Sequence, residues 1–244
     1  MPFEPTLKGN PMELTVNQHF HTAHAISKFY DSEDKVEVTI IKNKTTVKMS
    51  NRAKIFCTKR TWDQRAEKGY MSSIEKAFHE EIGNVKCFEK RNHEALSKYC
   101  LLWRLRHKYH LEEIEDITLT GVTGSGLTKD EEEILEKKHV SFVREGGSVP
   151  SRFTTGILIK MMFDRDWQTC CDFKWGLLEA SDGEFIVADG YGDFPFIPIS
   201  PNFAFRAGEK DQKINREQLV VLNNISIKIA KEFYFARNFR ECPI

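Results

Sequence analysis

Three histidines and an asparagine lie close together near the start of the chain, in the pattern Asn17-Gln-His19-x-His21-x-x-His24. Neutral imidazole binds divalent metals, and alternate residues of an extended segment point to the same side, so His19 and His21 could share one ion. No HExxH or CxxC motif accompanies them, which weakens the metal interpretation. Two others stay open: one buried, hydrogen-bonded histidine with the rest in solvent, or a metal-free site. In the latter, His19 would be the acid or base and Asn17 would hold a polar group of the substrate.

A carboxylate also stands where an apolar run gives way to a loop rich in glycine and proline. Asp189 ends the run that begins at Phe185, and Tyr191 and Asp193 follow it. A rigid strand positions the groups on the loop after it, so Asp189 is well placed for chemistry. The same carboxylate could instead cap the turn by accepting hydrogen bonds from backbone N–H groups.

A basic helical face is the third candidate. A helix is predicted to begin after Asn92 and to present Lys98, Arg104, Arg106 and Lys108 on its polar side. Such a face could contact phosphate groups, although a solvated helix surface is the commoner meaning of this pattern.

Composition limits the classes of protein to which the chain can belong. Its 244 residues are 40% apolar, enough for one large domain or two small ones. The 36 basic and 36 acidic residues cancel, so no global field favours nucleic acid or membranes, while local patches stay possible. Neither an 18-residue apolar run nor a signal-peptide pattern occurs, so we expect a cytoplasmic protein without a membrane partner. The six cysteines lack CxxC spacing and are expected to be reduced, and no cofactor is expected.

Two hairpins are predicted. Asp182-Gly183 separates two apolar runs, Trp175 to Leu178 and Phe185 to Val187, and Asp-Gly between β-prone runs is a strong turn signal. We expect the fold to be built on this hairpin. Alternating apolar residues predict a second hairpin from Lys35 to Met49.

Helical periodicity accounts for much of the remaining chain. Residues 1–12, with three prolines, are expected to form an irregular arm, and residues 13–244 a single α+β domain with helices packed around short antiparallel hairpins. The further predicted helices run from the capping box Ser72-x-x-Glu75 to Ile82, from the capping box Thr128-x-x-Glu131 to Lys138, from Ser151 to Phe163, and from Arg216 to about Asn238.

Several motifs together resemble an uncharacterised, mainly bacterial family, domain of unknown function 4238. Asn17-Gln-His-Phe followed by Ile26-x-x-Phe29 is similar to the family's opening Asn-x-His motif and Tyr-Leu-x-x-Phe helix. Phe185-Ile-Val-Ala-Asp-Gly190 and Pro198-Ile-Ser-Pro201 are similar to its Phe-Ile-Thr-Ser-Asp-Asn-Pro and Pro-Leu-Ser-Pro runs. The resemblance spans nearly the whole chain, with departures where Thr22, Ala188 and Gly190 replace the family's Pro, Ser and Asn.

The resemblance implies that Asn17, His19 and Asp189 lie on family motifs. If they converge in one cleft, we expect a metal-independent hydrolase acting on nucleic acid or a nucleotide. Asp189 would activate water or stabilise a cationic sugar during removal of a base, while the amide and imidazole orient the substrate. A flipped base needs aromatic walls and basic flanks. The substrate-binding residues would be Tyr191, Arg104, Arg106 and Lys108.

A protein without chemistry is the alternative. The Phe194-Pro-Phe-Ile-Pro198 loop would suit an apolar interface with a phage or host replication protein that the chain inhibits. The enzyme would have DNA or RNA as its partner instead. Carriage of family members near mobile elements implies, for either function, a role in bacterial anti-phage defence.

Overall fold

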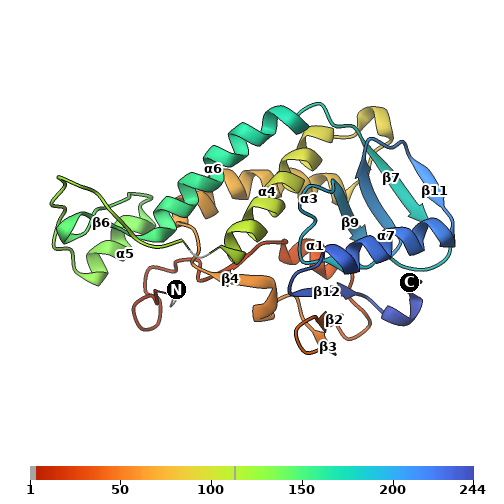
Figure 1. The fold of residues 1–244 in the computed structure, drawn as a ribbon, viewed down its shortest axis with the longest axis horizontal. Helices are drawn as coiled ribbons and strands as arrows, with labels where there is room; N and C mark the ends of the chain where they lie inside the picture. Colours follow the sequence, from red (N-terminus) through yellow and green to blue (C-terminus); the bar gives the residue numbers. More distant parts are fainter. Residues whose placement is uncertain (1–3, 113) are drawn as a thin grey trace.

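Two four-stranded sheets frame the body of the molecule among the residues that the computed structural model describes, 4–112 and 114–244 (Figure 1). The first has the order β3-β2-β12-β8 and is antiparallel. The second has the order β11-β7-β10-β9, in which β11 and β7 are parallel. The strands of the first sheet are β2 Val36–Ile40, β3 Thr45–Met49, β8 Val187–Ala188 and β12 Phe233–Ala236. Those of the second are β7 Trp175–Ala180, β9 Phe196–Ser200, β10 Phe203–Ala207 and β11 Gln212–Ile214.

Two long helices, α4 His93–Leu111 and α6 Ser151–Cys170, pack against each other and extend away from the second sheet (Figure 1). The Asn92 side chain caps α4 by accepting the N–H of Ala95 at 3.0 Å, as the sequence predicts. The other helices of the body are α1 Ala23–Ser27, α2 Gln64–Ala66, α3 Ser72–Gly83 and α7 Arg216–Ile229. Short 3₁₀ turns occur at Lys54–Phe56, Phe88–Lys90, Glu145–Gly147 and Phe239–Glu241.

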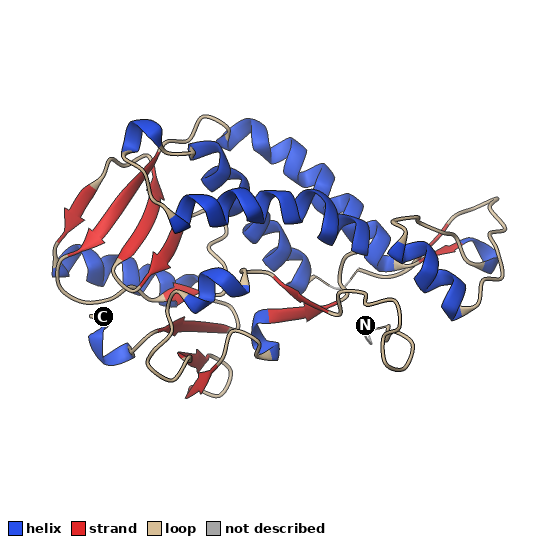
Figure 2. Ribbon diagram, turned by 180° about the vertical axis from the view of Figure 1, so that it is seen from behind, coloured by secondary structure: helices blue, strands red, loops and turns tan. Residues whose placement is uncertain are grey.

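Residues 114–150 form a lobe at the end of the molecule away from the four-stranded sheets, and Figure 2 shows it projecting beyond the long helices. It contains α5 Lys129–Lys137 and a small sheet of β5 Ile117–Thr118 and β6 Ser148–Val149. The predicted capping box is confirmed: Thr128 Oγ1 accepts the N–H of Glu131 at 3.3 Å, and the Glu131 carboxylate accepts the N–H of Thr128 at 2.8 Å. Local hydrogen bonds therefore start α5 independently of the body.

One apolar core joins both sheets to α3 and α4. Trp175 of β7 and Trp103 of α4 are at most 2% exposed, and Phe78 of α3 stacks on Tyr99 of α4 with 3.6 Å between ring centroids. Burial of such large rings supplies much of the free energy of folding. The α+β fold predicted from the sequence, with helices around short antiparallel strands, is confirmed.

The predicted hairpin between residues 175–178 and 185–187 is wrong. Strand β7 pairs with β10 and β11, whereas β8 pairs with β12 in the other sheet. Because both edges of β7 are occupied, Phe185 has no place beside it, and its N–H donates to the Pro201 carbonyl at 2.7 Å. Gly183 still turns the chain, with φ 108°, and a Cβ there would lie 2.7 Å from the Pro243 ring. Asp182-Gly183 thus links two sheets.

The hairpin predicted from Lys35 to Met49 is confirmed as β2 and β3. Lys44 has φ 55° in the turn between them. The prediction succeeds here because the two strands are adjacent in the sequence and pair with each other, so no distant segment is needed to form the hairpin. Strand β12 then adds to the free edge of β2.

The predicted capping box at Ser72 is wrong, although the helix it was meant to start exists. Ser72 has helical backbone angles and continues a π-helical segment, Glu67–Met71, which follows α2. The first turn of this helical stretch is capped by Asp63, whose carboxylate accepts the N–H of Ala66 at 2.6 Å. Glu75 is therefore free to bind another side chain.

The last predicted helix is too long. Helix α7 ends at Ile229, and the chain enters β12 at Phe233 rather than continuing to Asn238. The alternation Phe233-Tyr-Phe235 puts both phenylalanines in the core against Phe56. A period of two therefore prevails over the helical period here, because the strand completes the first sheet.

The remaining described segments add small elements. Residues 4–12 contain turns but no helix or strand, and the chain then forms β1 Asn17–His19, which pairs with β4 Cys57–Lys59. All six cysteines are free thiols, and burial raises the pKa of Cys57 to about 11 and that of Cys100 to about 12. Across residues 4–112 and 114–244, no helix is both long and apolar enough to cross a bilayer.

Candidate functional site

The three histidines of the N-terminal motif point to different neighbours. His19 Nε2 lies 2.9 Å from the Asn51 carbonyl, while His24 is exposed. His21 is buried, and its Nδ1 lies 2.8 Å from the Tyr99 hydroxyl. Burial lowers the pKa of His21 to about 3, so it stays neutral. Among residues 4–112 and 114–244, no group of three or more His, Cys, Asp and Glu is arranged to hold a metal.

Asn17 and His19 lie on the outward side of β1. Gln18 between them is 1% exposed, and its side chain bonds both the N–H and the carbonyl of Trp62. Alternation along the strand therefore turns Asn17 toward solvent and leaves His19 half-buried. The next residue, Phe20, is fully buried and turns toward the core.

Asp189 has a structural role: it caps the turn that leads into β12. Its carboxylate is buried and accepts the N–H groups of three consecutive residues that lead into β12: Lys231 at 3.1 Å, Glu232 at 2.6 Å and Phe233 at 3.2 Å. The turn-capping alternative thus describes its contacts. Among those described, none joins Asp189 to Asn17 or His19. Burial alone would raise the pKa of Asp189, but His107 and the backbone N–H groups lower it, so the carboxylate stays ionised.

His107 of α4 is the imidazole that lies beside Asp189. Its Nε2 is 3.5 Å from Asp189 Oδ2, and the side chain is 9% exposed. Gly190 packs directly on the ring, where a Cβ would lie 2.3 Å from His107 Nδ1. Trp103, one turn earlier on α4, donates its indole N–H to the Asp189 carbonyl at 3.0 Å. Contacts between α4 and the loop after β8 therefore fix the position of His107 relative to Asp189.

His107 lines a groove between α4, α6 and the loop after β8. The groove consists of two adjoining cavities, of about 200 and 510 Å³, which share the side chains of Arg104, Asp166 and Asp193 among their linings. His107 and Lys108 line the larger one. Of the predicted catalytic residues, Asp189 is the one next to the groove. It does not line either cavity itself, but it contacts His107, which lines the larger one.

The cations of the groove are paired with acids at its rim. Arg104 binds Asp166 and, at 2.7 Å, Asp193, whose side chain is 96% exposed. Lys108 is 3.7 Å from Glu112 and is itself exposed. The exposed contacts with Asp193 and Glu112 contribute little free energy, whereas the Arg104–Asp166 pair is partly buried. Lys108, and the Arg104 nitrogen that faces Asp193, can therefore turn to a ligand in the groove.

Arg106 is wrongly assigned to the exposed basic face. It is fully buried, binds Glu75 and lies 3.5 Å from Glu67, with its guanidinium 5.4 Å from the Trp62 ring centroid. Residues two apart on a helix point in nearly opposite directions, so Arg104 and Arg106 cannot share a face. By the same geometry positions 104, 107 and 108 do share one, and this is the signal that would have identified His107.

Tyr191 also points into the protein. Its hydroxyl lies 3.2 Å from the N–H of Ala188, donates to the Ile186 carbonyl at 3.3 Å, and lies 3.0 Å from Ser226 Oγ of α7. Burial raises the pKa of this phenol above its usual range. Its contacts therefore brace the loop after β8 rather than form an aromatic wall of the groove.

Comparisons with known proteins leave the chain without an assigned family. No family model matches it, and neither a curated protein nor a solved structure matches it. The resemblance to domain of unknown function 4238 stays a prediction.

Proposed function

We propose that the chain is a hydrolase acting on nucleic acid or a nucleotide, with its site in the groove beside α4. The observation that carries this proposal is the His107–Asp189 pair in the wall of a cavity that Arg104 and Lys108 also line. His107 takes the part that the sequence motif suggested for His19. Asp189 keeps a role, as a positioning residue behind the imidazole.

The chemistry follows the usual division of labour in an imidazole–carboxylate pair. With its proton on Nε2, toward the Asp189 carboxylate, His107 has Nδ1 as a base that can accept a proton from attacking water. The buried carboxylate then stabilises the imidazolium that forms. Arg104 and Lys108 would neutralise phosphate oxygens near the scissile bond, since guanidinium and ammonium groups match their charge.

The test is a product assay on the purified protein. Single-stranded and duplex DNA, RNA and nucleotides would be incubated with it, and release of base, phosphate or shortened strands measured. His107→Gln should reduce the rate by about 100-fold or more, the usual contribution of a general base. The matched control is His79→Gln, which changes a half-buried histidine that is bonded to Thr22 and lines neither cavity of the groove, and it should leave the rate unchanged. Equal rates for the two variants, or no product from any substrate, would refute the proposal.

The second candidate is a binding protein that inhibits a replication component, and the lobe favours it. Four of its large apolar side chains are at least 38% exposed: Ile117, Leu119, Val122 and Val140. Several exposed large apolar residues on one projecting part are a feature that a protein-binding surface would explain. The two candidates would be separated by expressing the chain in the cytoplasm of a bacterial host and counting phage plaques. Protection lost on His107→Gln favours the enzyme, and protection lost only on Val122→Ser with Val140→Ser favours the binding protein.

A further inference from the structure

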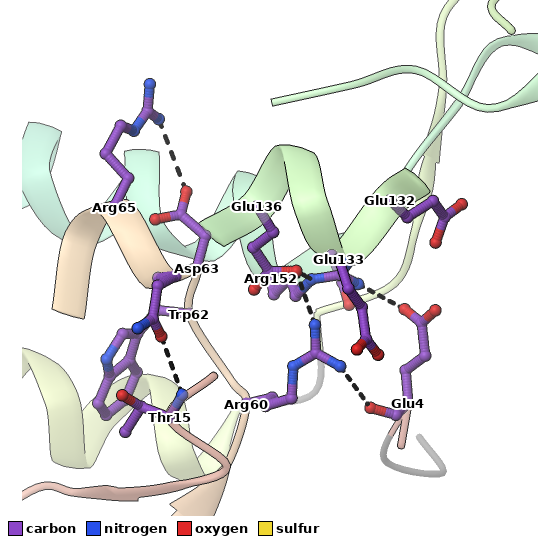
Figure 3. Close-up of polar contacts among 12 residues, drawn as sticks. Glu4, Thr15, Arg60, Trp62, Asp63, Arg65, Glu132, Glu133, Glu136 and Arg152 are labelled. Carbon is purple, nitrogen blue, oxygen red and sulfur yellow. Dashed lines mark hydrogen bonds and ion pairs between the residues drawn. The ribbon is translucent and has the colours of Figure 1, made fainter. Parts of the chain in front are cut away.

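Glu4 of the N-terminal arm places its carboxylate among three cations from two other parts of the chain. Lys129 Nζ and Arg144 Nη2 lie 2.5 Å from Oε1, and Arg152 of α6 binds Oε2. The Glu4 carbonyl also accepts a hydrogen bond from Arg60 at 3.2 Å, as Figure 3 shows. The arm is thus bound much as a short acidic peptide would be.

The three arginines of this cluster do not depend on Glu4 for their position. Arg60 and Arg152, whose side chains are 2% and 4% exposed, both bind Glu136 of α5, at 2.6 and 2.8 Å (Figure 3). Arg144 makes a two-pronged contact with Glu132 at 2.5 and 2.6 Å. Because other carboxylates hold these guanidinium groups, they would stay in place if Glu4 left. Preformed donors reduce the ordering cost of binding a new anion.

The cluster also has more donors than Glu4 uses. Arg152 Nη2 and Arg60 Nε are buried without a hydrogen-bond partner. Both residues line a cavity of about 490 Å³, together with Thr61, Ser151 and Thr155. Ser151 and Arg152 begin the 20-residue helix α6, and Pro150 before them supplies no side-chain cap. A helix N-terminus favours an anion, and unpaired guanidinium N–H groups beside it need acceptors.

The lining limits how much negative charge can enter. Glu112 and Asp116 also face the cavity, and Asp116 accepts the N–H of Ser151 at 2.8 Å. These carboxylates repel a polyanion such as a nucleic-acid backbone. At the arginine end, Glu132 and Glu136 each engage part of the guanidinium groups, so the charge there suits one small anion. The pKa of Glu4 fits an anion site: burial would raise it, but Arg152 and Lys129 lower it to about 2.

We propose that this cavity is a binding site for a phosphate monoester, and that Glu4 is its exchangeable internal occupant. A tetrahedral phosphate offers acceptors to Arg60, Arg144 and Arg152 at once, where the Glu4 side chain supplies two oxygens. Phosphate and the arm then compete for the same arginines, so phosphate binding displaces residues 4–7 from the cavity. The lining of this site shares no residue with the groove beside α4, so it is independent of the proposed hydrolytic site.

Displacement of the arm breaks specific contacts. The N–H of Leu7 donates to Glu133 Oε1 at 2.7 Å, next to the Glu4 contacts on the same lobe. Ligand binding therefore couples the arm and the lobe through one set of charges. A ligand shifts the equilibrium between the bound and the displaced arm only because it binds more tightly to the cavity from which the arm has left.

The experiment is a calorimetric titration of the full chain with inorganic phosphate at low ionic strength. Glu4→Gln removes the competing charge and should tighten binding by about tenfold, because the internal occupant no longer reduces the population of open sites. The matched control is Glu13→Gln, which removes a carboxylate just after the arm that is 89% exposed and 4.0 Å from Lys137. It should bind phosphate like the parent chain. Arg144→Gln, added to Glu4→Gln, should weaken binding at least tenfold.

Equal affinities for Glu4→Gln and Glu13→Gln, or binding unaffected by Arg144→Gln, would overturn the proposal. A second measurement needs no variant. Phosphate, but not chloride at equal ionic strength, should speed proteolysis of the arm in the parent chain, and equal rates in both salts would contradict the competition. Titrations with a nucleoside monophosphate and a sugar phosphate then show which class of monoester fits.

Discussion

Two buried carboxylates, Asp189 in the body and Glu136 in the lobe, are satisfied in different ways. Asp189, 1% exposed, accepts three backbone N–H groups at the start of β12. Glu136, 3% exposed, accepts the guanidinium groups of Arg60 and Arg152. The first carboxylate is held by dipoles that the fold has already fixed, and the second by ions that had to leave water.

The difference bears on stability and on responsiveness. Removing two or three ions from water costs much of what their attraction returns, so a buried ion network adds less free energy than its contacts suggest. Breaking such a network is nevertheless costly, because a charge is left buried alone. The partly exposed charges around Glu4 should therefore respond to salt, pH and anions, whereas the buried Glu136 pairs and the Asp189 contacts should respond mainly to mutation.

The largest expected effect is at Glu136. Glu136→Ala leaves two buried guanidinium groups without their shared acceptor and should lower the free energy of unfolding by about 3–5 kcal/mol. Urea denaturation measures it. The control is Glu131→Ala on the same helix, which removes an exposed capping-box side chain and should cost about 1 kcal/mol. A loss at Glu136 no larger than at Glu131 would remove the distinction between the two regions.

Asp189→Ala should cost about 3 kcal/mol, because three buried N–H groups lose their acceptor. Hydrogen exchange at Lys231, Glu232 and Phe233 should accelerate, while amides of the lobe should be unaffected. The loss should change little between low and high salt, because the lost contacts are buried. A strongly salt-dependent loss would show that the carboxylate acts through ion pairing instead.

Gly190→Ala tests how closely the loop after β8 packs on α4. The new Cβ would lie 2.3 Å from His107 Nδ1, so the imidazole or the loop must move, at a cost of about 1–3 kcal/mol. The control is Gly83→Ala at the end of α3, where a Cβ meets nothing within 4 Å and stability should not fall. Thermal unfolding of both variants is the measurement. An unchanged midpoint for Gly190→Ala would mean that the loop yields easily and does not position His107.

The smallest expected effect is at Glu4. Its pKa is lowered from 4.5 to about 2 in the folded protein, so its contribution to stability is present above pH 4.5 and is lost as pH falls through 2. The difference in unfolding free energy between the parent chain and Glu4→Gln should be about 1 kcal/mol or less, since solvent screens a side chain that is 35% exposed. Denaturation from pH 6 to pH 2 should show that difference vanishing. A difference that grows toward acid pH would contradict the ion-pair assignment.

Features with local causes were predicted best. The helix start at Asn92, the capping box at Thr128 and the hairpin from Lys35 to Met49 depend on hydrogen bonds and backbone angles within a few residues, and all are confirmed. Ser72 carries the same capping signal as Thr128 but fails, because the chain before it is already helical. A capping sequence therefore starts a helix only where the residues before it are not already helical.

The candidate site was predicted in part. Asp189 was correctly placed at a strand end, and Arg104 and Lys108 do line a groove, but the imidazole beside Asp189 is His107 rather than His19. No short motif marks His107, whose only signal is its position on the same helical face as Arg104. Its distance to Asp189 depends on how α4 packs against the first sheet, which local patterns do not specify.

The amino-acid order alone therefore determined the α+β class, the helices that begin at Asn92 and Thr128, and the hairpin from Lys35 to Met49, since those follow from hydrogen bonds and burial within a few turns. Only the packed molecule decided which strands pair and which charges meet. Strands β7 and β8 separate because β10 and β11 occupy both edges of β7. Glu4 reaches Arg152 across 148 residues because the arm, the lobe and α6 meet at one place. Contacts of that kind depend on the shape of the whole chain, and no segment encodes them by itself.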